Sequence, residues 1–173
     1  MDSVSLKKIA YDKLASNLEE ILKYYRSLLD CVRKEKDLLI AAQIEQLNES
    51  NAHKEQLTIR IKALDQLRIT YATELAQILQ ADSVQPRLLE IAQKIGGAEG
   101  EKLRTMHSAL EMVIKRLSDL NRENSVYAQS ALRTVSSALD NFKDQLSGQK
   151  TYQNKGKYKS GVDTSGHFVA KKA

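Results

Sequence analysis

Apolar residues recur three or four positions apart along most of the chain, and the longest such stretch runs from Glu99 to Leu146. This spacing is that of one face of an α-helix. A helix of this length is not held by intrinsic propensity alone, and its apolar face needs a partner. The stretch therefore predicts a long helix that packs against the rest of the chain or binds another protein.

The same helical spacing, in segments dominated by good helix formers, predicts helices at about residues 5–41, 44–81, 85–95 and 99–147. Ile40 and Ile44 are assigned to the apolar faces of the first two helices. Their break has no Gly or Pro and is inferred from a polar stretch after Ala41. One continuous helix is the alternative, but it would leave its apolar stripe uncovered, and a short connection is commoner.

The short third segment has clearer boundaries, because Ser83 and Pro86 are typical of a helix start and Gly96-Gly97 of a helix end. The overall prediction is an all-α fold over residues 1–147. It is an antiparallel bundle of three long helices plus one short helix, with coiled-coil-like packing near Leu57–Leu67.

Residues 148–173 differ in composition from the rest of the chain. They hold four of the seven Gly, six Lys and one Asp, so their net charge is +5, which equals that of the whole chain and leaves residues 1–147 neutral. This composition predicts a disordered basic tail. Because the helices show no one-sided basic patch, the sequence argues against nucleic-acid binding. A binder of nucleic acid or acidic surfaces that uses the tail lysines is a minor alternative.

The sequence offers no converged catalytic groups. The three His are scattered, and no His or Cys pair has the spacing of metal ligands. We therefore expect no enzyme activity, no cofactor and no metal. Cys31 is the only cysteine, which excludes an internal disulfide and leaves a small buried thiol as the expected role. No signal peptide and no apolar run of about 20 residues is found, so we expect a cytoplasmic protein.

Two asparagines interrupt the apolar stripe of the last helix near its middle. Counting by three or four from Leu110 places both Asn121 and Asn124 on the apolar seam. One interpretation is that they fix the register of the helix or pair with other polar groups. The other is that the bundle does not fully cover this part of the seam, which then forms a docking groove for a partner's amphipathic helix.

Three stretches stand out in the sequence. The first runs from Leu28-Leu29 through Glu35 to Lys54 and Leu57. The second is Leu120-Asn121-Arg122-Glu123-Asn124 in the long last helix. The third is Thr151-Tyr152, followed by Gly156 and a basic end. In this order and spacing, which cover nearly the whole chain, they resemble the FlgN family of flagellar export chaperones, whose first helix bears a Glu and whose second helix bears a Lys.

This resemblance implies a cytosolic chaperone that binds the C-terminal amphipathic helix of hook–filament junction proteins of the FlgK and FlgL type. It would prevent their premature assembly and deliver them to the export gate protein of the FlhA type. The residues that would bind the substrate protein are Leu117, Leu120, Asn121, Asn124, Ala128, Leu132, Val135, Leu139, Phe142 and Leu146.

The residues that would bind the gate are Tyr152, Gly156 and Tyr158. In the family the tail's Tyr is often followed almost at once by Gly, whereas three residues intervene after Tyr152, so either Tyr can be the anchor. A homodimer is left open. The alternative function is a structural or adaptor coiled-coil protein without a secretion role, which would form a stable homo-oligomer with its seam covered.

Overall fold

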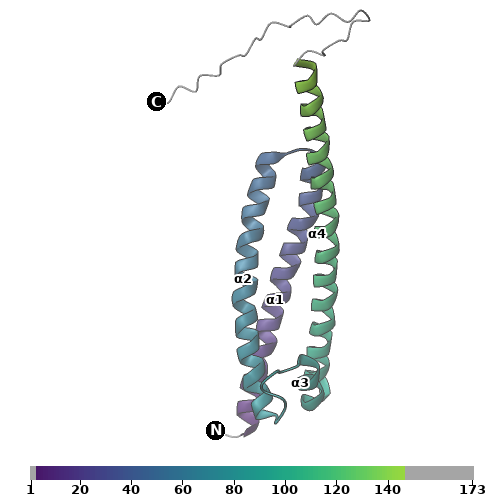
Figure 1. Ribbon diagram of the computed structural model, residues 1–173. Helices are drawn as coiled ribbons and strands as arrows, with labels where there is room; N and C mark the ends of the chain where they lie inside the picture. The colour runs from purple at the N-terminus through teal and green to yellow at the C-terminus, as the bar shows by residue number, and fades with distance from the viewer. Residues whose placement is uncertain (1–2, 147–173) are drawn as a thin grey trace, which may run out of the picture. The chain divides into compact units, whose positions relative to one another are not determined.

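The computed structural model describes residues 3–146, and in this range it consists of four helices without a strand. They are α1 (Ser3–Ile40), α2 (Ile44–Ile78), α3 (Leu88–Ile95) and α4 (Gly97–Leu146), as Figure 1 shows. The predicted all-α fold of three long helices and one short helix is confirmed. The predicted tail, residues 148–173, lies outside the described residues.

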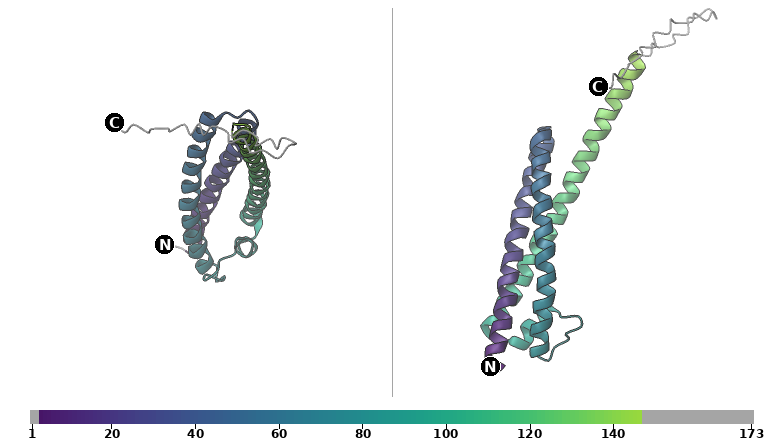
Figure 2. Two further views of the ribbon diagram at one scale, coloured as in Figure 1. Left: turned by 45° about the horizontal axis from the view of Figure 1, so that its top comes forward. Right: turned by 90° about the vertical axis from the view of Figure 1, so that its left-hand side faces the viewer.

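The chain divides into two units, Met1–Arg133 and Thr134–Ala173. In the first unit, α1 and α2 lie side by side and antiparallel, and α3 lies at the end of the hairpin where α1 begins (Figure 2). Hydrogen bonds join Tyr11 to Glu99 and Val32 to Asn124, which are 88 and 92 residues apart. Because the difference in residue number between the bonded partners stays similar along the bundle, α4 up to Arg133 runs parallel to α1.

The turn between α1 and α2 is built without glycine. Ala42 adopts a positive φ of 53°. Its N–H donates to the carbonyl of Leu39 at 3.3 Å, and the N–H of Gln43 donates to the carbonyl of Leu38 at 3.0 Å. These two bonds form a Schellman motif, which usually places Gly at the left-handed position. The helix therefore ends where the polar stretch begins, although the sequence carries no glycine signal there.

The connection from α2 to α3 differs from the prediction at both ends. Gln80 has a positive φ of 54°, so α2 ends at Ile78. The Asp82 carboxylate then accepts from the backbone N–H groups of Val84 and Gln85 at 2.9 and 3.2 Å. This Asx turn holds the chain in a loop. As a result α3 begins only at Leu88, and the expected helix start with Ser83 as its cap is wrong.

The joint between α3 and α4 depends on two glycines. Gly96 follows α3 with a φ of 67°, a conformation that L side chains avoid. Gly100 is buried in the first turn of α4, and a Cβ atom at this position would overlap the carbonyl oxygen of Ala92. The backbones of α3 and α4 therefore approach more closely than any side chain at residue 100 would allow.

The apolar core falls into two clusters. The first core cluster lies near α3 and contains Ala10, Tyr11, Leu14, Ala15, Leu18, Ala72, Leu75, Ala76, Ile91, Ala92, Leu103 and Met106. The second core cluster lies toward the α1–α2 turn and contains Leu28, Leu29, Val32, Leu57, Ile61, Leu117 and Leu120.

The second core cluster stops short of the α1–α2 turn. Its last member on α1 is Val32 and its first member on α2 is Leu57. Ile40 and Ile44, which were assigned to the apolar faces of their helices, are 64 % and 62 % exposed. The bundle therefore leaves this end of the two apolar faces uncovered, because Ile40 and Ile44 lie beyond the end of the core.

Candidate functional site

Four large apolar side chains on α4 are exposed to solvent and share one helical face. We call Leu132, Val135, Leu139 and Phe142 the apolar stripe; their exposed fractions are 66, 58, 55 and 59 %. They are three, four and three residues apart on one continuous helix. An exposed apolar stripe with this spacing is typical of helices that bind another helix.

The charges beside the apolar stripe cancel. Arg133 and Lys143 contribute two positive charges, and Asp140 and Asp144 contribute two negative ones. A partner would therefore be selected by apolar contact and shape rather than by long-range electrostatic attraction. This neutrality contrasts with the tail, where the sequence places a net charge of +5.

The other predicted substrate-binding residues differ in their surroundings. Leu117 and Leu120 belong to the second core cluster, and Asn124 is also buried. Ala128 is half-buried. The side chains of the first three are covered by the chain's own helices, so the accessible part of the predicted surface begins beyond Asn124. Leu146 is the last residue of α4, while Tyr152, Gly156 and Tyr158 lie outside the described residues.

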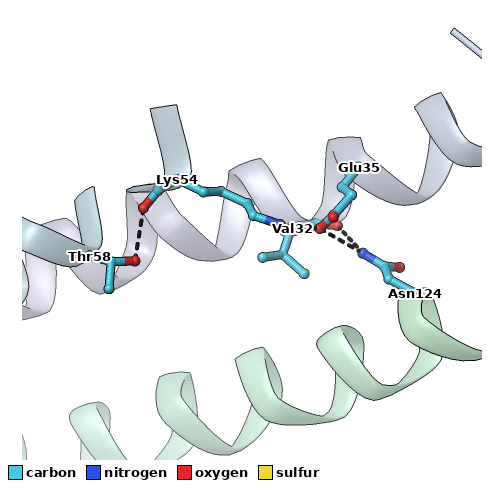
Figure 3. A network of polar contacts seen from close by, with 5 residues as sticks. All are labelled: Val32, Glu35, Lys54, Thr58 and Asn124. Carbon is cyan, nitrogen blue, oxygen red and sulfur yellow. Dashed lines mark hydrogen bonds and ion pairs between the residues drawn. The ribbon is translucent and has the colours of Figure 1, made fainter. Parts of the chain in front are cut away.

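A polar network joins α1, α2 and α4 at the edge of the second core cluster (Figure 3). The amide nitrogen of Asn124 donates to the backbone carbonyl of Val32 at 2.9 Å and to the Glu35 carboxylate at 3.2 Å. Lys54 Nζ donates to the same carboxylate oxygen at 2.7 Å. We call Glu35, Lys54 and Asn124 the three-helix network. All three lie within the first two stretches that carry the family resemblance.

The three-helix network is partly removed from water. The side chains of Lys54 and Glu35 are 22 % and 14 % exposed, and Asn124 is 4 % exposed. Such an ion pair adds little net stability, but the loss of one partner is costly because it leaves a poorly solvated charge. Asn124 Oδ1 has no hydrogen-bond partner among the described residues. The contacts of Asn124 agree with the interpretation that a seam asparagine pairs with other polar groups.

Asn121 is exposed, so its predicted place on the internal seam is wrong. The covered positions run through Leu117, Leu120 and Asn124, with spacings of three and then four. Counting four residues from Leu117 leads to Asn121 instead, one residue past the true seam position at Leu120. Sequence spacing alone could not separate these two paths along the helix.

A groove of about 740 Å³, which the sequence did not reveal, lies among all four helices in the first unit. Leu18 and Ile21 of α1 contribute buried apolar side chains to it. On α2 Arg68 pairs with Asp65 at 2.7 Å. On α4 His107 faces Glu111 at 3.5 Å, and Leu88 and Leu89 are supplied by α3. Because its residues come from four segments, periodicity within one segment could not indicate it.

Other chemistry is sparse in the described residues. No group of three or more His, Cys, Asp or Glu among residues 3–146 could hold a metal ion. None of the helices described combines the length and the apolar character needed to cross a bilayer. Cys31 is a half-buried free thiol, and burial raises its pKa, which lowers the reactive thiolate fraction.

Comparison with known families gives a match over most of the chain. The family model described as FlgN protein matches residues 1–160. Neither a curated protein nor a solved structure matches the chain significantly. The family match includes all four helices and continues to a residue beyond Tyr158. The resemblance found in the sequence is therefore confirmed, and the chain belongs to the FlgN family of flagellar export chaperones.

Proposed function

We propose that this protein is a cytosolic chaperone for hook–filament junction proteins of the FlgK and FlgL type. It binds their C-terminal amphipathic helix, prevents premature assembly and delivers them to the export gate protein of the FlhA type. Family membership supports the general role of a flagellar export chaperone. The observation that supports the binding mode is the exposed apolar stripe of Leu132, Val135, Leu139 and Phe142.

The magnitude of the available apolar burial fits a reversible complex. Full burial of one large apolar side chain contributes about 1.5–3 kcal/mol, and the four residues of the apolar stripe are each a little over half exposed. Covering them contributes on the order of 5 kcal/mol, from which the cost of association must be subtracted. A client helix therefore needs further contacts beyond the stripe, and its release requires no unfolding of the chaperone.

The proposed contact with the gate uses the tail and is separate from the client site. Tyr152 or Tyr158, with Gly156, would supply one aromatic anchor on a basic segment. A single anchor gives weaker binding than a helix-wide apolar surface. This difference in strength would let the chaperone keep its client while it docks at the gate and leaves it.

The proposal is tested with purified full-length protein and a peptide of the C-terminal helix of a hook–filament junction protein, using titration calorimetry. Leu139→Asp and Phe142→Asp each place a charge in the apolar stripe, and each should lower the affinity by tenfold or more while the helical circular dichroism is unchanged. Ser137→Asp is the matched control, because it adds the same charge to the opposite face of α4 and should leave affinity unchanged.

The division of labour is tested separately with Tyr152→Ala and Tyr158→Ala. Calorimetry should show unchanged client affinity for both, and at least one should reduce export of junction proteins into the culture medium. Unchanged client affinity in Leu139→Asp and Phe142→Asp would refute the stripe as the client site. Loss of client binding in the tail variants would refute the separation of the two contacts.

A further inference from the structure

The apolar contacts of α4 do not by themselves define its register on the α1–α2 hairpin. From α4 the two core clusters receive Leu103, Met106, Leu117 and Leu120. Apolar contacts are non-directional, so any large apolar side chain brought to the same place can replace another. The register must therefore be decided by features other than general apolar contact, such as close backbone packing and directional hydrogen bonds.

A displacement of α4 by three residues toward its C-terminus would preserve the character of most covered positions. Leu117 would take the place of Leu120, Ile114 that of Leu117, and Leu103 that of Met106. Asn121 would take the place of Asn124, opposite Glu35 and Lys54. The shift corresponds to a translation of about 4.5 Å with a partial rotation of the helix.

The opposite displacement is not compatible with the core. Moving α4 by three residues toward its N-terminus would bring Glu123 to the place of Leu120 and Tyr127 to that of Asn124. The first change would bury a carboxylate in the second core cluster, which is strongly unfavourable without a partner. Of the two displacements by three residues, only the one toward the C-terminus is therefore compatible with the core, and it is the one that presents Asn121 to the three-helix network.

Two features hold the observed register, one of close packing and one of hydrogen bonding. At one end, Leu103 is fully buried and Gly100 lies against the carbonyl of Ala92, and the shift would replace Leu103 by Gly100. Toward the other end, Asn124 donates to Val32 and Glu35. Beyond Asn124 no side chain of α4 up to residue 145 is fully buried, so Asn124 is the last buried residue of this helix in the described range.

We infer that Asn124 sets the axial register of α4, and that Asn121 marks a second register displaced by three residues. In the first unit, this register decides where Tyr127 and Leu132 lie relative to α1. In the observed register Lys36 Nζ lies 5.3 Å from the centre of the Tyr127 ring and pairs with Glu123 at 3.4 Å. The inference concerns the fold and does not depend on the identity of the client.

The test measures the distance between spin labels on α1 and α4 by pulsed electron resonance. Lys8→Cys and Ser125→Cys supply exposed label sites in a full-length Cys31→Ser background. Their axial separation in the observed register is about 40 Å, and the second register lengthens it by about 4.5 Å. We expect one distance with Asn124 present, and an added longer population in Asn124→Ala.

Two further variants make the result decisive. Asn124→Leu replaces the amide with an apolar side chain suited to the seam, so it tests the register if Asn124→Ala does not fold, and it should also show the longer distance. Asn121→Ala combined with the Asn124 change should remove the longer population. Asn17→Ala is the control, because it deletes the other buried asparagine, which bonds to Leu64 on α2, and should leave the distance unchanged.

An unchanged single distance in both Asn124→Ala and Asn124→Leu would overturn the inference, whatever happens to their stability. A longer population that persists in the double variant would overturn the role of Asn121. If Asn124→Ala loses stability and also shows the longer distance, while Asn17→Ala loses stability at an unchanged distance, the result would support a role of Asn124 in setting the register beyond ordinary packing.

Discussion

Gly100→Ala should destabilise the protein, although the same change inside a helix ordinarily stabilises it. Ala is favoured over Gly by about 1 kcal/mol in a helix interior, because Gly loses more backbone freedom on folding. Gly100 already lies inside α4, and its N–H donates to the carbonyl of Gly96 at 2.9 Å. Helix propensity alone therefore predicts a more stable variant.

The contact between α3 and α4 reverses this sign. The new Cβ atom would overlap the carbonyl oxygen of Ala92, which is a backbone atom and cannot move away as a flexible side chain would. Ala92 and Ile91 are fully buried, so relief requires moving α3 out of the first core cluster. Overpacking of this kind costs about 1–3 kcal/mol, and a backbone overlap belongs at the upper end. After the propensity gain is subtracted, we expect a net loss of about 1–2 kcal/mol.

The measurement is urea and thermal unfolding followed by circular dichroism at the helical band. For a chain of this size the loss corresponds to a fall in Tm of about 2–8 °C. Ser108→Ala, an exposed change on the same helix, is the control and should be neutral or slightly stabilising. A Gly100→Ala variant as stable as the original protein would show that α3 and α4 do not approach as closely as described.

Three further predictions use the same unfolding assay. Ala42→Gly should raise the free energy of unfolding by about 0.5–1 kcal/mol, because Gly removes the strain of a left-handed residue at the α1–α2 turn; a lower stability would contradict the Schellman geometry. Leu75→Ala should cost about 2–5 kcal/mol, because this side chain is fully buried, and a cost below 1 kcal/mol would argue against the first core cluster. Burial raises the pKa of Tyr25 above its ordinary 10.0, with a smaller contribution from Asp65, so the unfolded chain releases this proton first and stability falls as the pH rises above about 10. Tyr25→Phe should reduce that alkaline loss, and an unchanged pH profile would contradict it.

Much of the fold follows from local patterns in the sequence. Apolar residues recur at helical spacing in three long segments, most regularly in α1 and α4, and Gly96-Gly97 marks the joint before α4. The turn at Ala42 is harder to locate, because an alanine occupies a left-handed position where a glycine would have given a signal. The start of α3 is missed for a similar reason, since the Asp82 carboxylate holds an Asx turn in place of a helix cap at Ser83.

The candidate site is less predictable, because it depends on which part of the long apolar face of α4 is covered by the other helices. Leu120 and Leu132 look equivalent in the sequence, yet one is 6 % and the other 66 % exposed. The difference arises from where the second core cluster ends, which is a property of three helices together. Asn121 is exposed and Asn124 is buried, because the covered positions of α4 pass through Leu120 and then, four residues later, Asn124.

The separation of the interior into two clusters gives the bundle two regions that can open independently. The free energy of a local opening depends on the contacts that it breaks. The end near the α1–α2 turn can therefore unfold while the contacts among α3, Leu14 and Leu75 persist. Amide hydrogen exchange should therefore be slowest around the first cluster, faster around Leu57 and Leu117, and fastest in α4 beyond Asn124. Such a gradient confines most structural fluctuation to the segment of α4 that carries the apolar stripe, while the residues of the first core cluster stay rigid.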